Sequence, residues 1–175
     1  GLQCDARSAI LMDGVTGQVL YEQSANERIS PASFVKVMTL YVIFDAIRAG
    51  KLKTDDMVTV SERAWKRTYK TTSSTMFLKV GERVKVEDLL KGVAIVSGND
   101  ACVALAEHLS GSEEAFVSRM NEKAAFLGLK DTQFKNSDGG SAEGQYTTAM
   151  EMAILSKGYI EDHPVTLALH STVDY

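Results

Sequence analysis

Ser33 and Lys36 are the first pair of residues whose types and spacing could do chemistry. They stand three positions apart, so in a helix both lie on one face. The segment over 34–47 is apolar on every side of such a helix, which predicts a buried element. Burial and the partial positive charge at the helix N-terminus favour a neutral Lys36 amine, which can accept the proton of the Ser33 hydroxyl. The alternative is that Ser33 caps the helix and Lys36 extends to solvent.

Ser97-Gly98-Asn99 forms a second polar group, between two segments with helical patterning. Side chains at such a junction can point into a cleft. Taken alone, the tripeptide is a glycine-containing turn in which Asn99 caps the next helix. Taken together, Ser-x-x-Lys followed by Ser-x-Asn has the order and spacing of penicillin-binding proteins and class A β-lactamases.

Apolar patterning predicts the elements that must position these residues. Residues 8–13 and 18–22 are expected to form a β-hairpin with apolar residues on both faces, as in a sheet covered on both sides. A buried helix is expected over 33–49, and Gly50 is expected to end it.

The rest of the chain is predicted to be mainly helical. A loop-rich stretch with a strand at 57–60 and a helical turn at 61–65 comes first, and helices follow over 86–96, 100–109, 113–127 and 148–159. The last of these helices starts with a capping box. The expected organisation is a hairpin and nucleophile helix over 1–50, a mainly helical subdomain over 51–160 and a tail over 161–175.

The composition is that of a folded protein, with 45% apolar residues, 24% charged residues and a net charge of −4. This charge gives no basis for nucleic-acid binding, which needs a basic surface. Lys66, Arg67 and Lys70 lie near two aromatic residues and are interpreted as part of a solvated loop. No apolar stretch reaches the roughly 20 residues of a membrane span.

The cysteines and histidines predict neither a metal site nor a cofactor. Cys4 and Cys102 form no Cys-x-x-Cys pair and are interpreted as free, buried thiols, with a disulfide between them as the alternative. His108, His163 and His170 have no metal-ligand spacing, and no role is assigned to them.

The chain resembles the low-molecular-mass D-alanyl-D-alanine carboxypeptidases over essentially its whole length. The likeness lies in residues 9–13, 16–17, 31–39, 97–104, 128–129 and 144–146. It implies an α+β fold of the β-lactamase/DD-peptidase type, in which an antiparallel sheet carries a helical subdomain. It also implies that Ser33 is acylated and that Lys36 accepts its proton. Ser97 would help to pass a proton to the leaving group, and Asn99 would hold the substrate amide.

The family's third motif, Lys-Thr-Gly or Lys-Ser-Gly, is absent, because Lys53-Thr54 is followed by Asp55 and Lys70-Thr71 by Thr72. In the family this motif lies on an inner strand that contacts the substrate carboxylate and completes the oxyanion hole. Losing one oxyanion donor typically lowers the rate by about 10²–10³-fold. We therefore expect the C-terminal sheet strands and this motif to come from a second segment or chain.

The resemblance implies an enzyme that acts on peptidoglycan stem peptides ending in D-Ala-D-Ala and is acylated by β-lactam antibiotics. It further implies a place outside the cytoplasm, after removal of a signal peptide. A β-lactamase is one alternative, but its Glu-x-x-Leu-Asn motif is absent between residues 136 and 152. A catalytically silent module that binds peptidoglycan or a partner chain is the other, and the missing third motif supports it. Gly139-Gly140 replaces the Gly-Leu pair common in the family, which leaves the substrate role of that loop open.

Overall fold

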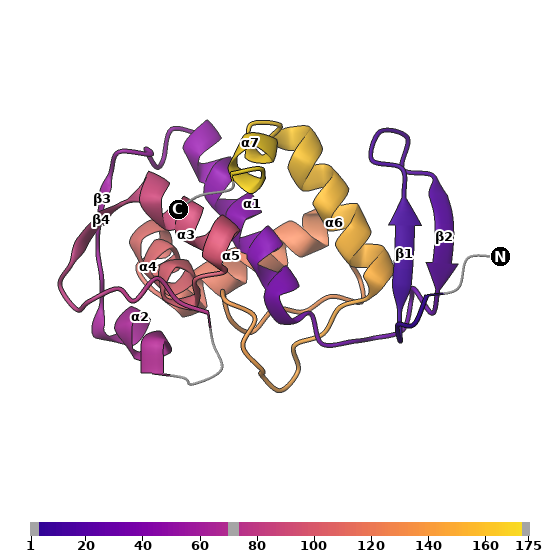
Figure 1. Cartoon of the computed structure of the whole chain (residues 1–175), viewed down its shortest axis with the longest axis horizontal. Helices are drawn as coiled ribbons and strands as arrows, with labels where there is room; N and C mark the ends of the chain where they lie inside the picture. Colours follow the sequence, from indigo (N-terminus) through magenta and orange to yellow (C-terminus); the bar gives the residue numbers. More distant parts are fainter. Residues whose placement is uncertain (1–3, 70–73, 173–175) are drawn as a thin grey trace.

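Two short two-stranded antiparallel sheets and a group of helices make up the computed structural model, which describes residues 4–69 and 74–172 (Figure 1). The first part contains β1 (Ala9–Met12), β2 (Val19–Gln23), the 3₁₀ turn η1 (Ala32–Phe34) and α1 (Val35–Arg48). The elements that follow are β3 (Met57–Thr59), α2 (Glu62–Lys66), the 3₁₀ turn η2 (Arg67–Tyr69), β4 (Arg83–Lys85), α3 (Val86–Val96), α4 (Asn99–Ser110), α5 (Glu113–Phe126), α6 (Ala149–Asp162) and α7 (Thr166–His170). Hairpin β1–β2 lies at one end beside α6, and β3–β4 lies at the other end, with α1 between them (Figure 1).

Helix α1 occupies the centre of the molecule, as its apolar surface predicts. Met38, Tyr41 and Ile43 point to different sides of the helix, yet each is fully buried. Helices α3, α4, α5 and α6 all pack against α1. The helix ends where Gly50 adopts a φ of +69°, a left-handed conformation that favours glycine. The buried helix predicted from the sequence is therefore confirmed.

The β1–β2 hairpin forms with the expected pairing, in which Ile10 lies opposite Glu22 and Leu11 opposite Tyr21. In its turn, Asp13 Oδ1 accepts hydrogen bonds from two main-chain N–H groups. Strand β1 packs against α6. The sequence predicted a sheet that is covered on both faces. Leu11 on the hairpin is 51% exposed, however, so among the described residues this sheet is not covered on both faces.

The helices predicted for the rest of the chain are confirmed to within a few residues. Ser112 and Thr148 cap α5 and α6 by accepting hydrogen bonds from the N–H groups of Ala115 and Glu151. Strand β4 and helix α7 were not predicted. Strand β4 is only three residues long and is defined by its pairing with β3, which local patterning does not reveal. No helix among residues 4–69 and 74–172 is long and apolar enough to cross a membrane.

Two interpretations of single residues need correction. Arg67 does not lie in a solvated loop: it follows α2, and its side chain is only 18% exposed because it contacts buried carboxylates. Cys4 is exposed, whereas Cys102 is buried in α4, and both are free. Lys70 and Thr71 fall outside the described residues, as do residues 173–175 of the predicted tail.

The two thiols should differ sharply in reactivity. Burial raises the pKa of the Cys102 thiol well above its usual range, so the reactive thiolate is suppressed as well as inaccessible. Iodoacetamide added to the native protein should modify Cys4, and Cys102 should react only after denaturation. Peptide mass spectrometry measures both, and rapid native alkylation of Cys102 would contradict the packing of α4.

Candidate active site

The four residues singled out from the sequence line one cleft of about 360 Å³. Ser33 and Lys36 come from η1 and the first turn of α1, and Ser97 and Asn99 come from the junction of α3 and α4. The structure thus brings together two motifs that are more than sixty residues apart in the chain. A third segment, Asp138-Gly139-Gly140, lines the same cleft; the sequence left the role of this loop open.

Lys36 is buried, with 6% of its surface exposed, whereas Ser33 is exposed at the cleft. Lys36 Nζ donates a hydrogen bond of 2.6 Å to the main-chain oxygen of Asp138. Among the described residues, no hydrogen bond joins Lys36 Nζ to the Ser33 hydroxyl, contrary to the sequence-based expectation. The carbonyl of Asp138 therefore holds the amine in place beside the serine.

Gly139 fixes how closely the third segment approaches Ser33. Its φ is +87°, and a Cβ atom at this position would lie 2.0 Å from the main-chain oxygen of Ala32. Ala32, which precedes Ser33, itself has a φ of +46°, a conformation that costs a non-glycine residue about 1–2 kcal/mol. Strained residues of this kind cluster at functional sites, where the surrounding packing holds them.

Ser97 and Asn99 are also placed by unusual backbone geometry. Ser97 ends α3 in the left-handed conformation, with a φ of +57°. Gly98, not Asn99, is the N-cap of α4, so the simpler interpretation of Asn99 as a capping side chain is wrong. The N–H of Asn99 donates to the Ser74 carbonyl at 2.9 Å, which fixes the start of α4 against the segment that begins at Ser74 and also lines the cleft.

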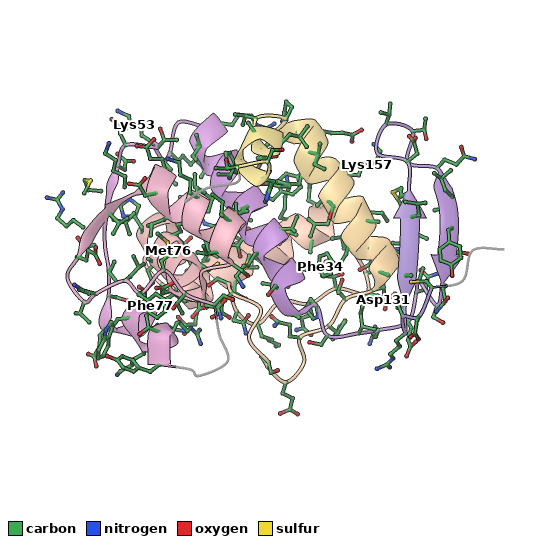
Figure 2. All side chains as sticks on the ribbon, in the orientation of Figure 1. Phe34, Lys53, Met76, Phe77, Asp131 and Lys157 are labelled. Carbon is green, nitrogen blue, oxygen red and sulfur yellow. The ribbon has the colours of Figure 1, made fainter. Side chains whose placement is uncertain are left out.

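Asp100 anchors that segment and was missed in the sequence. Its carboxylate is fully buried and accepts hydrogen bonds from the N–H groups of Met76, Leu78 and Ala101, at 2.9 to 3.1 Å. Met76 lies over α3 (Figure 2), and a Cβ atom on Gly92 would come within 1.8 Å of its sulfur. In the sequence, an acidic residue at the start of a helix predicts only a favourable interaction with the helix dipole. The local pattern does not indicate that Asp100 accepts hydrogen bonds from Met76 and Leu78.

Three further buried or half-buried charges lie behind the cleft. Arg67 contacts the carboxylates of Glu113 and Asp138, which are each only 2% exposed. These residues come from three separate parts of the chain, so no spacing rule could have grouped them. No group of three or more His, Cys, Asp and Glu side chains across residues 4–69 and 74–172 is placed to hold a metal ion.

Comparison with known proteins gives this arrangement a context. The chain matches the D-alanyl-D-alanine carboxypeptidase family, Peptidase_S11, over residues 2–174. It is 48% identical to D-alanyl-D-alanine carboxypeptidase DacC of Escherichia coli over 98% of this chain and 43% of the relative. It is 46% identical to D-alanyl-D-alanine carboxypeptidase DacF of Bacillus subtilis, over the same shares of the two sequences. The chain thus spans less than half the length of these curated relatives.

The fold agrees with this match. The structure superposes on penicillin binding protein 5 from Haemophilus influenzae with a TM-score of 0.96 and 42% identity, covering 100% of this chain and 51% of the other. It also superposes on a Streptomyces K15 DD-transpeptidase with a TM-score of 0.84 and 28% identity, covering 92% of this chain and 63% of the other. The α+β fold of the DD-peptidase type predicted from the sequence is confirmed, and the chain belongs to the D-alanyl-D-alanine carboxypeptidase family.

Proposed function

We propose that the full-length protein is a serine-type D-Ala-D-Ala carboxypeptidase that removes the terminal D-alanine of peptidoglycan stem peptides. The observation that carries this proposal is the cleft in which Ser33 and Lys36 face Ser97 and Asn99. The family match and the names of the relatives support the same activity. We assign the activity to the full-length protein because the relatives are more than twice as long as this chain.

Ser33 is proposed as the nucleophile and Lys36 as its proton acceptor. The Ser33 oxygen attacks the carbonyl carbon of the terminal peptide bond while its proton passes to Lys36 Nζ. A neutral amine has two N–H groups and one lone pair. Because one N–H is directed at the Asp138 carbonyl, the lone pair can be directed at the serine hydroxyl. The position of Lys36 supports this role, since the residue is buried and lines the same cleft as Ser33.

Ser97 and Asn99 are proposed to complete the reaction. Ser97 passes the proton to the departing D-alanine amine, and Asn99 binds the amide of the stem peptide. Water then hydrolyses the ester on Ser33 and releases the shortened peptide. The N–H of Ser33 is one oxyanion donor, and we propose that the second comes from a strand carrying Lys-Thr-Gly or Lys-Ser-Gly.

We also propose three features of the biological setting. A β-lactam acylates Ser33 because it presents a reactive carbonyl in the same cleft. A further segment or chain covers the β1–β2 hairpin, where Leu11 and Leu20 are 51% and 57% exposed. The protein acts outside the cytoplasm, where peptidoglycan lies, after removal of a signal peptide.

Labelled penicillin tests the assignment of the nucleophile. In the full-length protein the adduct should map to the peptide that contains Ser33, and Ser33→Ala should abolish both labelling and release of D-alanine. Ser30→Ala, which changes an exposed serine outside the cleft, is the matched control and should behave like the unaltered protein. An adduct on Ser30 or Ser97 would overturn the assignment. Penicillin turnover at typical enzyme rates, about 1–10³ per second, would favour a β-lactamase instead.

A methyl group at position 139 should impair acylation. Gly139→Ala would force the loop away from Ala32, and a shift of about 1 Å at a reacting centre can lower a rate by roughly 10²-fold. The second-order rate constant for penicillin acylation measures the effect. Gly128→Ala is the matched control, because Gly128 also has a positive φ but has open space around it. Equal rates for both variants would show that the close approach to Ala32 does not matter.

Residues 1–175 alone should not be an active enzyme. The exposed hairpin residues and the absent third motif predict association and little release of D-alanine from a D-Ala-D-Ala peptide. Light scattering and a D-alanine assay on this fragment, beside the full-length protein, check both points. A stable, active monomer would contradict the proposal of a second segment.

A further inference from the structure

A chain of buried ion pairs lies behind the proposed active site, outside both sequence motifs. Arg67, at the end of α2, places Nη2 3.0 Å from Oε2 of Glu113 and Nε 3.1 Å from Oδ2 of Asp138. The arginine therefore bridges the first residue of α5 and the loop that closes the cleft. Both carboxylates are 2% exposed, and neither can be solvated by bulk water.

The two carboxylates accept hydrogen bonds from main-chain N–H groups of the loop, in addition to their ion pairs with Arg67. Glu113 Oε1 accepts hydrogen bonds from the N–H of Ser137 at 3.1 Å and from its hydroxyl at 2.9 Å. Asp138 Oδ1 accepts a hydrogen bond from the N–H of Gly140 at 2.8 Å. The main-chain N–H groups of Ser137 and Gly140 are thus held by the two carboxylates that Arg67 contacts.

On its other side, the same loop faces α1. The hydroxyl of Thr39 donates to the Ser137 carbonyl at 2.6 Å, and Lys36 Nζ donates to the Asp138 carbonyl at 2.6 Å. The acceptor that holds Lys36 is therefore part of the residue whose side chain pairs with Arg67. A displacement of Asp138 that shifts its main chain would also shift the carbonyl that holds Lys36 Nζ.

Arg67 is the cation that this arrangement depends on. Glu113 has a second partner, because Arg63 Nη2 lies 2.8 Å from its Oε2, but Arg63 makes no ion pair with Asp138 among the described contacts. Removing one member of a buried pair leaves an uncompensated charge, which the structure relieves by moving the group toward water. For Asp138, the route to water leads into the cleft that its residue lines.

We propose that Arg67 is a positioning residue for acylation, acting through Asp138 and Glu113 to hold Lys36 beside Ser33. The inference rests on the proposed function, since it assigns a task to the Ser33–Lys36 pair. Among the described residues, the ion pairs of Arg67 are with Glu113 and Asp138, which flank the Ser33–Lys36 pair. Its effect should therefore fall on the acylation step and not on the binding of the β-lactam that precedes it.

The test is Arg67→Met in the full-length protein, with acylation by a fluorescent penicillin followed at increasing concentrations. Saturation separates the dissociation constant of the initial complex from the first-order acylation rate constant. We expect the rate constant to fall by roughly 10- to 100-fold, as for a slightly misplaced catalytic group, while the dissociation constant stays within about threefold. The final yield of acyl-enzyme gives the active fraction, so partial unfolding lowers the yield and not the rate constant.

Arg63→Met is the matched control, because it removes an arginine of the same helix that also contacts Glu113. Its acylation rate constant should remain within about threefold of the unaltered protein, a range that corresponds to less than 1 kcal/mol. If Arg67→Met does not fold, Asp138→Asn replaces it, since the amide keeps the shape and the Gly140 contact but loses the ion pair. We expect its rate constant to fall as well.

The outcomes separate the two proposals. Unchanged acylation in folded Arg67→Met, or in Asp138→Asn where the first variant fails, would overturn the role of Arg67. An equal fall for Arg63→Met would also overturn it, because general loss of charge around Glu113 would then suffice. Failure of the unaltered protein to form an adduct on Ser33 would instead overturn the proposed function.

Discussion

The hydrogen bond from Lys36 Nζ to the Asp138 carbonyl is the interaction on which the rest of the site depends. A lysine within a buried helix needs a polar partner, because an unpartnered charge or amine in an apolar interior is costly. The partner is a main-chain oxygen, so the loop over 137–140 must run close to the first turn of α1. That closeness explains Gly139, since any side chain there would meet the backbone that leads into Ser33.

The same constraint explains why so many charges lie behind the cleft. A loop held against a helix only by its own main chain would be free to shift. Here the carboxylates of Glu113 and Asp138 fix the loop through hydrogen bonds. The positive charge of Arg67 compensates the negative charge of these two buried carboxylates. On the opposite wall, the buried carboxylate of Asp100 fixes the segment over 76–78 by accepting hydrogen bonds from its main-chain N–H groups. The strained conformations of Ala32 and Ser97 persist because both walls are fixed in this way.

The sequence predicted those parts of the structure that depend on local patterns. The apolar surface of the 34–47 segment and the capping box at Thr148 indicated helices α1 and α6. The Ser-x-x-Lys and Ser-x-Asn motifs indicated the four residues that line the cleft. The contacts between distant segments could not be predicted. Arg67 looked like a solvated residue because its partners lie some 46 and 71 positions later in the chain. The apolar residues of the hairpin indicated a covered sheet, but the sequence could not show which segment covers it.

The most direct test of the central claim is a crystal structure of the full-length protein acylated by penicillin. The account predicts continuous density from the Ser33 oxygen to the penicillin carbonyl carbon. It also predicts Lys36 Nζ within about 2.7–3.2 Å of the Asp138 carbonyl and directed at the cleft. Density attached to another residue, or a Lys36 side chain turned away from Asp138 into solvent, would contradict it.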